Sequence, residues 1–287
     1  MDKDRQQPVL GILAGGGPLP GKVAEAAKKK GYSIFIVAFK DFAEPHIVSS
    51  WPHEYVRLAA AGRILNTLRQ NNCKELVLIG PVKRPSFFDL RPDPEGVRIL
   101  GKIGKALFAG DDGLLASLVR VLNEEGFTVR GAHEFLQPVY EGILGDVIPD
   151  KLALQDIAKG IKINKVIGEL DIGQACIVQN ELVIAVEAME GTDAMLKRAK
   201  DCQQPGLGGI LIKQVKPNQE RKADMPTIGP KTVYNAHYSG LRGIAFEAEG
   251  TLLIHKDEMV AIANQKGLFL LSYNPVTFEQ KYLRKEN

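Results

Sequence analysis

Short apolar runs rich in branched residues alternate with amphipathic stretches through the first half of the chain. Strands are predicted for four of the apolar runs, Val9–Leu13, Ser33–Phe39, Glu75–Gly80 and Phe127–Ala132. Helices are predicted for the stretches between them that end at Gly or Asn, namely Leu19–Gly31, Gly62–Asn72 and Gly113–Gly126. This succession indicates an α/β fold with a doubly wound, mostly parallel sheet and a ligand crevice at the carboxyl ends of its strands.

The pattern changes at residues 137–150, where Pro and Gly interrupt both periodicities, and we interpret this stretch as a domain connection. A helix is predicted at Leu152–Gly168, and the apolar runs Gln174–Gln179 and Leu182–Glu187 flank a two-residue turn, as in a β-hairpin. Further apolar runs follow, so the second half predicts a mixed α+β domain. The expected organisation is a Rossmann-like α/β domain at 1–136, a connection at 137–150 and an α+β catalytic domain at 151–287.

Composition and charge narrow the functional classes. A chain of 287 residues is long enough for two domains, each with its own core. Its formal charge of +3, from 37 basic and 34 acidic side chains, gives no global field for non-specific nucleic-acid binding. The three cysteines form no CxxC pattern, and no stretch has the length and apolarity of a membrane span, so a cytoplasmic protein is expected.

The segment "ILAGGGPLP" joins the first predicted strand to the first predicted helix. Gly15 and Gly17, which flank Gly16, fit part of a dinucleotide fingerprint, but Pro20 stands where its third glycine belongs. Pro18 and Pro20 also lack N–H groups for a phosphate, which argues against a standard NAD site. Two interpretations stay open: a tight strand-to-helix turn, or a modified phosphate or sugar contact.

The segment "GPVKRPSFFDLRPD" follows another strand end and combines basic with aromatic side chains. Lys83, Arg84 and the adjoining Pro85 are candidates for substrate binding, because basic groups pair with phosphates. The aromatic rings of Phe87 and Phe88 could pack against a base or an acyl chain. A solvated, proline-rich surface loop is the alternative interpretation.

The densest group of acids lies in "VEAMEGTDAMLKRA". Gly191 frees a turn, Thr192 can cap the following helix and Asp193 falls in its first turn, which needs no function. Glu187, Glu190 and Asp193 nevertheless lie within seven residues, close enough for some of them to share a hard cation through oxygen ligands. Metal or phosphate chemistry and a simple helix cap are both compatible with this pattern.

Two further residues complete the candidate chemistry. Asp224 lies in a long irregular segment stiffened by prolines, where a carboxylate can bind a metal or orient a water. Lys213, on the strand before it, could neutralise phosphate charge or could simply face solvent.

Five motifs, "ILAGGGPLP", "GPVKRPSFFDLRPD", "GDDGLL", "EAMEGTDAMLKRA" and "DMPTIGPKTV", occur in this order across nearly the whole chain. With these five motifs in combination, the sequence resembles the LpxI family of UDP-2,3-diacylglucosamine pyrophosphatases. The resemblance implies hydrolysis of the UDP-2,3-diacylglucosamine pyrophosphate to UMP and 2,3-diacylglucosamine 1-phosphate in lipid A biosynthesis, with a Mg²⁺ requirement. It also implies two domains with the substrate cleft between them. Asp224 matches the catalytic aspartate of the family's D-[LM]-P motif, with Thr192 and Asp193 as its partners.

The predicted site therefore has three parts. The catalytic residues are Asp224, Asp193 and Thr192, and the Mg²⁺ ligands are Asp193, Asp224 and Glu187. The substrate-binding residues are Gly15, Gly16, Gly17, Lys83, Arg84, Pro85 and Lys213. The expected partners are the lipid-linked nucleotide sugar and the inner-membrane surface, for which Phe87 and Phe88 are the candidate contact, and not nucleic acid. The alternatives are an NAD-dependent nucleotide-sugar oxidoreductase or epimerase, and a non-catalytic nucleotide-sugar binding protein.

Overall fold

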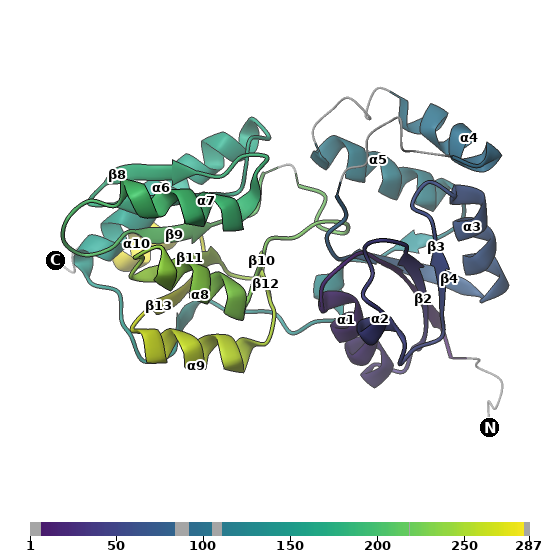
Figure 1. The fold of residues 1–287 in the computed structure, drawn as a ribbon, viewed down its shortest axis with the longest axis horizontal. Helices are drawn as coiled ribbons and strands as arrows, with labels where there is room; N and C mark the ends of the chain where they lie inside the picture. Colours follow the sequence, from purple (N-terminus) through teal and green to yellow (C-terminus); the bar gives the residue numbers. More distant parts are fainter. Residues whose placement is uncertain (1–6, 84–91, 105–110, 218, 284–287) are drawn as a thin grey trace. The chain divides into compact units, whose positions relative to one another are not determined.

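The computed structural model describes residues 7–83, 92–104, 111–217 and 219–283 (Figure 1). The chain forms two compact units. The N-terminal unit consists of Met1–Gln137 with Glu220–Asp224, and the C-terminal unit consists of Pro138–Gln219 with Met225–Asn287. Within the described part of the chain, no helix combines the length and apolarity that crossing a membrane requires.

The N-terminal unit is built on a five-stranded, wholly parallel sheet of order β3-β2-β1-β4-β5. Its strands are β1 (Val9–Ala14), β2 (Ser33–Phe39), β3 (His53–Val56), β4 (Cys73–Ile79) and β5 (Thr128–Val129). The central strand β1 and its neighbour β2 are almost fully buried, which is why they form continuous apolar runs rather than alternating ones. The predicted parallel, doubly wound sheet is confirmed.

The helices α1 (Leu19–Lys29), α3 (Ala61–Gln70) and α5 (Asp111–Glu124) pack against this sheet. The short helix α2 (Pro45–Val48) packs against α1, and α4 (Pro94–Ile103) packs against α3 and α5. A 3₁₀ turn at Ala132–Glu134 lies beside β4. Leu68 of α3 and Val121 of α5 are fully buried in one core with Leu76 of β4. Ala223, from the distant segment Glu220–Asp224, packs against the same core.

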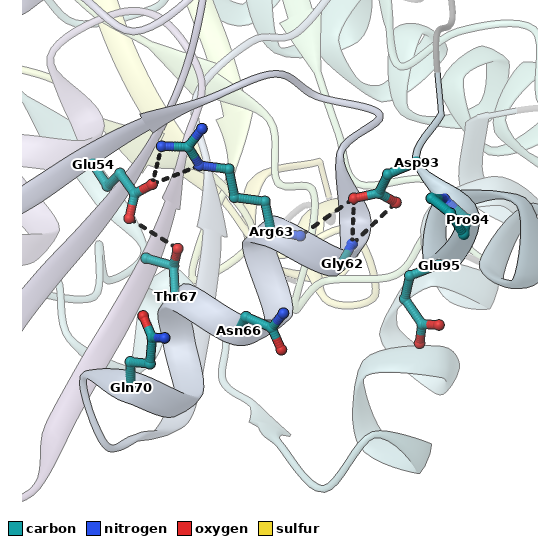
Figure 2. Close-up of a pocket in the computed structure, with 9 residues that line it drawn as sticks. All are labelled: Glu54, Gly62, Arg63, Asn66, Thr67, Gln70, Asp93, Pro94 and Glu95. Carbon is teal, nitrogen blue, oxygen red and sulfur yellow. Dashed lines mark hydrogen bonds and ion pairs between the residues drawn. The ribbon is translucent and has the colours of Figure 1, made fainter.

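Asp93 joins the N-termini of two helices of this unit (Figure 2). As the N-cap of α4 it accepts the Gly96 N–H at 2.6 Å, and its other oxygen accepts the N–H groups of Gly62 at 2.9 Å and Arg63 at 3.3 Å in α3. One carboxylate thus satisfies backbone donors of two helices and lies at the positive end of both dipoles.

Replacing Asp93 by alanine is expected to loosen both helix starts, because capping aspartates contribute up to about 2 kcal/mol each. Hydrogen–deuterium exchange should then speed up at the amides of Gly62, Arg63 and Gly96, by about 30-fold if the local loss is about 2 kcal/mol. The change should be confined to α3 and α4. Unchanged protection at these amides would show that Asp93 does not stabilise the helix starts.

The C-terminal unit contains a six-stranded mixed sheet of order β6-β13-β11-β9-β7-β8. Its strands are β6 (Gly142–Leu144), β7 (Ala175–Gln179), β8 (Leu182–Val186), β9 (Ile210–Lys213), β11 (Gly243–Glu247) and β13 (Phe269–Tyr273). β6 and β7 run antiparallel to their neighbours, so β8, β9, β11 and β13 all point the same way. The predicted β7–β8 hairpin is confirmed, and β6 shows that part of the stretch interpreted as a connection belongs to this sheet.

Helices cover both faces of the C-terminal sheet (Figure 1). They are α6 (Lys151–Glu169), α7 (Gly191–Ala199), α8 (Pro230–Tyr238), α9 (Lys256–Lys266) and α10 (Phe278–Tyr282), with a 3₁₀ turn at Lys200–Cys202. Alternate strand residues face opposite sides: Leu211 packs with α7, α8 and α9, whereas Ile212 packs with α6 and α10. A separate pair of short parallel strands, β10 (Thr227–Ile228) and β12 (Leu252–Leu253), lies beside α8.

Candidate active site

The candidate site of the C-terminal unit lies where its parallel strands end. Glu187 directly follows β8, and Lys213 is the last residue of β9. Because β8 and β9 have the same direction, their carboxyl ends share one edge of the sheet. Open α/β sheets bind their ligands outside this edge, so these two side chains are placed where a ligand would be expected.

Glu187, Thr192 and Lys213 form one hydrogen-bonded cluster, called here the Glu–Thr–Lys cluster. The Thr192 hydroxyl donates to Glu187 Oε1 at 2.7 Å, and Lys213 Nζ donates to Thr192 Oγ1 at 2.9 Å. Lys213 Nζ also donates to the Thr227 carbonyl oxygen at 3.4 Å. Glu187 and Lys213 are each only 5% exposed, so the cluster is a buried pair of opposite charges bridged by a hydroxyl.

The helix following β8 positions Thr192. Gly191, with φ of +80°, turns the chain into α7, as the sequence predicted. The interpretation of Thr192 as the helix cap was wrong, because the N-cap is Glu190 and no side chain caps this helix. The Thr192 hydroxyl is bonded to Glu187 instead, which is a tertiary contact that helix-capping rules do not contain.

Two residues that the sequence did not indicate hold the end of β9 in place. Tyr273, at the end of β13, donates its hydroxyl to the Lys213 carbonyl oxygen at 3.3 Å. Burial raises the pKa of Tyr273 well above its usual range, so the phenol keeps the proton that it donates. Asn164 of α6 donates to the neighbouring Ile212 carbonyl oxygen at 2.9 Å. Both residues occupy core positions and belong to no motif, so they carried no signal of this role.

Asp193 follows Thr192 but faces a different environment. Its carboxylate accepts from Asn235 Nδ2 at 2.8 Å and pairs with Lys231 Nζ at 2.7 Å, both on α8. The Asp193 side chain is 52% exposed, so solvent screens its ion pair with Lys231. The same exposure leaves the carboxylate accessible to a ligand.

The described residues contain no group of three His, Cys, Asp or Glu side chains that could hold a metal. Mg²⁺ usually takes only one or two carboxylates and completes its shell with water and phosphate oxygens. The accessible Asp193 fits this requirement. Glu187 fits it less well, because its Oε1 is bonded to Thr192 within a cluster that already contains the Lys213 ammonium. Mg²⁺ binding stays a prediction.

Asp224 is half-buried in the segment Glu220–Asp224, which belongs to the N-terminal unit. Its N–H donates to the Glu220 carbonyl oxygen at 2.9 Å, which closes a turn and holds the carboxylate on ordered backbone. Along the chain, Asp224 precedes by three residues Thr227, whose carbonyl accepts from Lys213.

Models of known families cover most of the chain. The model described as LpxI N-terminal domain matches residues 9–139, and the model described as LpxI C-terminal domain matches residues 140–271. The chain belongs to the LpxI family. A Caulobacter vibrioides protein named UDP-2,3-diacylglucosamine pyrophosphatase LpxI is 38% identical over 274 residues, which are 93% of this chain and 98% of that protein. The resemblance drawn from the five motifs is therefore confirmed.

In this LpxI-family chain, the three glycines after β1 have all their amides engaged. Gly15 and Gly16 donate to the carbonyl oxygens of Ile79 at 2.9 Å and Pro81 at 3.0 Å, and Gly17 donates to Glu44 Oε1 at 3.2 Å. A Cβ at Gly15 would lie 2.3 Å from the Gly80 carbonyl oxygen, so glycine is needed for this close approach. Backbone packing and hydrogen bonding therefore explain the presence of these glycines without a bound nucleotide. The NAD-dependent alternative is not favoured. Their contact with substrate stays a prediction.

The remaining predicted residues follow β4 in the sequence. Lys83 is exposed. Arg84 and Pro85, like Phe87 and Phe88, lie outside the residues that the structure describes. Their expected contacts with substrate or a membrane surface stay predictions.

An open, polar pocket of about 540 Å³ lies in the N-terminal unit between α3 and the start of α4 (Figure 2). It is lined by Glu54, Gly62, Arg63, Asn66, Thr67, Gln70, Asp93, Pro94 and Glu95. Glu54 pairs with Arg63 at 2.7 Å and accepts from Thr67 at 2.9 Å, so these polar groups satisfy one another. None of the predicted site residues lines this pocket, and we interpret it as a structural feature of the N-terminal unit.

Proposed function

We propose that this protein hydrolyses the pyrophosphate bond of UDP-2,3-diacylglucosamine and thereby acts in lipid A biosynthesis. The products are UMP and 2,3-diacylglucosamine 1-phosphate. The observation that carries the proposal is the buried Lys213 ammonium at the carboxyl edge of the C-terminal sheet, held by Thr192. The name of the relative supplies the substrate class.

Lys213 meets the main electrostatic requirement of the reaction. A pyrophosphate diester carries negative charge that repels an incoming nucleophile, and this charge grows on the leaving group as the bridging P–O bond breaks. A cation that is fixed before the reaction stabilises this charge without reorganisation, and it acts more strongly in a site from which water is excluded. Lys213, 5% exposed and bonded to Thr192 and Thr227, has this character.

Asp224 is the residue that we assign to the attacking water. Its carboxylate accepts a proton while the water oxygen forms a bond to one phosphorus and the bridging P–O bond breaks, which releases the two monophosphates. Three residues of extended chain span at most about 11 Å. The chain itself therefore tethers the Asp224 backbone within reach of Thr227, whose carbonyl accepts from Lys213.

Asp193 and Asp224 are the carboxylates that would hold Mg²⁺ together with phosphate oxygens. When bound, the ion would supply Lewis-acid stabilisation of phosphate charge. Glu187 is less suited to this role, because its Oε1 accepts the Thr192 hydroxyl beside the Lys213 ammonium.

The proposal is tested by incubating the full-length protein with UDP-2,3-diacylglucosamine and measuring UMP by chromatography. We expect UMP release with Mg²⁺, loss of release on addition of EDTA, and recovery with excess Mg²⁺. UDP-glucose serves as the control for recognition of the acyl groups and should be a much poorer substrate. A folded protein that binds the lipid-linked nucleotide but releases no UMP would instead support the non-catalytic binding function.

A further inference from the structure

Glu187 is the member of the Glu–Thr–Lys cluster to which the proposed mechanism gives no direct contact with substrate. We propose that Glu187 is a positioning residue that acts through the Thr192 hydroxyl to hold the Lys213 ammonium in its phosphate-binding place. This inference rests on the proposed function, because it concerns the same site. It assigns Glu187 a role other than the metal ligand suggested by its position among acids in the sequence.

The hydrogen atoms of the cluster fix the direction of its hydrogen bonds. A threonine hydroxyl has one hydrogen to donate and two lone pairs that accept. A carboxylate can only accept and an ammonium can only donate, so the order is fixed: Lys213 donates to Thr192, and Thr192 donates to Glu187. With its proton committed to Glu187, the Thr192 oxygen presents its lone pairs to Lys213. Without Glu187, that hydroxyl would be free to turn its hydrogen toward another acceptor, such as a phosphate.

Burial makes this order energetically significant. Glu187 and Lys213 are each 5% exposed, and charges buried to this extent are stable only when they are paired and hydrogen-bonded. Glu187 Oε2 is buried and accepts no hydrogen bond from the described residues, so the bond from Thr192 to Oε1 is the principal support of this carboxylate. The cluster is therefore expected to respond as a unit when any one member is changed.

The backbone supports Glu187 from the opposite side. Glu187 N–H donates to the Ala175 carbonyl oxygen at 2.8 Å. A Cβ at Gly173 would lie only 2.1 Å from the Glu187 carbonyl oxygen, so the two backbones are in direct contact. A side chain on such a fixed backbone can orient its neighbours with little loss of entropy, which is what a positioning residue requires.

The experiment uses four variants of the full-length protein: Glu187→Gln, Glu187→Ala, Thr192→Val and the double variant Glu187→Ala/Thr192→Val. Each is assayed for UMP release and, without metal, for UMP binding by calorimetry. Glu187→Ala and Thr192→Val are each expected to lower kcat/KM by about 100-fold and to weaken UMP binding by about 10-fold. Glu187→Gln keeps an acceptor oxygen for the Thr192 hydroxyl and should lose only about 10-fold in kcat/KM. The double variant should be no worse than either single variant, because both act on Lys213 through the same chain of hydrogen bonds.

Two further variants separate positioning from folding. Thr192→Ser restores the hydroxyl and should recover most of the activity that Thr192→Val loses. Glu258→Gln is the matched control, since Glu258 is exposed on α9, belongs to no part of the site and should leave activity unchanged. Thermal unfolding of each variant identifies any that is misfolded. In that case the two mildest substitutions decide between positioning and folding: Glu187→Gln, which keeps the shape of the side chain, and Thr192→Ser, which removes one methyl group.

Three results would overturn the inference. Multiplicative losses in the double variant would show that Glu187 and Thr192 act independently. Unchanged metal-free UMP binding with a raised Mg²⁺ requirement in Glu187→Gln would make Glu187 a metal ligand. Full activity of Glu187→Ala would make it dispensable. If the wild type releases no UMP, the proposed function fails on its own, and the metal-free UMP binding of the same variants still tests whether Glu187 positions Lys213.

Discussion

Replacing Asp224 by alanine is expected to lower kcat for UMP release by about 1000-fold or more, with a smaller change in KM. A positioned general base contributes about 100- to 10,000-fold to a proton-transfer step, and loss of a metal-binding carboxylate would add to this effect. Asp224 follows a closed turn to Glu220, so the substitution removes the carboxylate without removing a backbone hydrogen bond. The measurement is steady-state kinetics of UMP release at saturating Mg²⁺.

The Asp224→Asn variant tests the charge rather than the size of the side chain and should be nearly as inactive as Asp224→Ala. Asp201→Asn is the matched control, because Asp201 is exposed on the 3₁₀ turn after α7 and belongs to no part of the site. Activity of Asp224→Ala within about threefold of the wild type would remove Asp224 from the chemistry, because loss of a general base costs far more than this.

The pattern of apolar residues predicted most strands of both sheets, because strands that are buried on both faces form continuous apolar runs. β1, β2 and β4 are apolar on both faces, and a continuous apolar run shows this directly. The short edge strand β3, with the sequence HEYV, has one buried residue and gave no such signal. The helix α4 was also missed because Gly96 and Gly101 lower its intrinsic propensity.

Contacts from distant segments stabilise α4. Asp93 caps it while also binding the start of α3, and Arg98 of α4 pairs with Glu125 just after α5. The strong hydrogen bond from Arg98 holds the pKa of the Glu125 carboxyl below its usual range. Such contacts depend on the tertiary fold and cannot be obtained from the pattern of α4 alone.

In the candidate site, too, local sequence predicted which residues matter but not the tertiary contacts between them. Local spacing was sufficient to select Glu187, Thr192 and Lys213 as candidate site residues, because acids, a hydroxyl and a cation lie at or just after predicted strand ends. It could not show that Lys213, 21 residues after Thr192, donates to its hydroxyl, or that Thr192 is bonded to Glu187 rather than capping α7. The amides of the glycine loop give the complementary example, since their partners on Ile79, Pro81 and Glu44 come from other strands and loops.

The stability of the C-terminal unit is expected to depend strongly on Asp156, a residue of α6 that is 1% exposed. Its carboxylate accepts the N–H groups of Asn180 at 3.1 Å and Glu181 at 2.6 Å, at the turn of the β7–β8 hairpin. Both turn residues, Asn180 and Glu181, have positive φ, near +52° and +58°. Asparagine tolerates this left-handed conformation, but it is unfavourable for glutamate. The buried carboxylate therefore offsets a strained turn, and the Arg242 guanidinium lies 3.6 Å from it.

Replacing Asp156 by alanine should lower the free energy of unfolding by about 3 kcal/mol, because hydrogen bonds to a charged group contribute about 1.5 to 3 kcal/mol each. Urea denaturation monitored by circular dichroism would measure this loss. Asp156→Asn keeps one acceptor oxygen and should lose about half as much, whereas Asp150→Asn changes the more exposed partner of Arg242 and should lose less than Asp156→Ala. Since the same hairpin leads into Glu187, faster amide exchange at Asn180 and Glu181 should accompany the loss in stability. Unfolding at the wild-type urea concentration would mean that the turn residues hold their own conformation without the carboxylate.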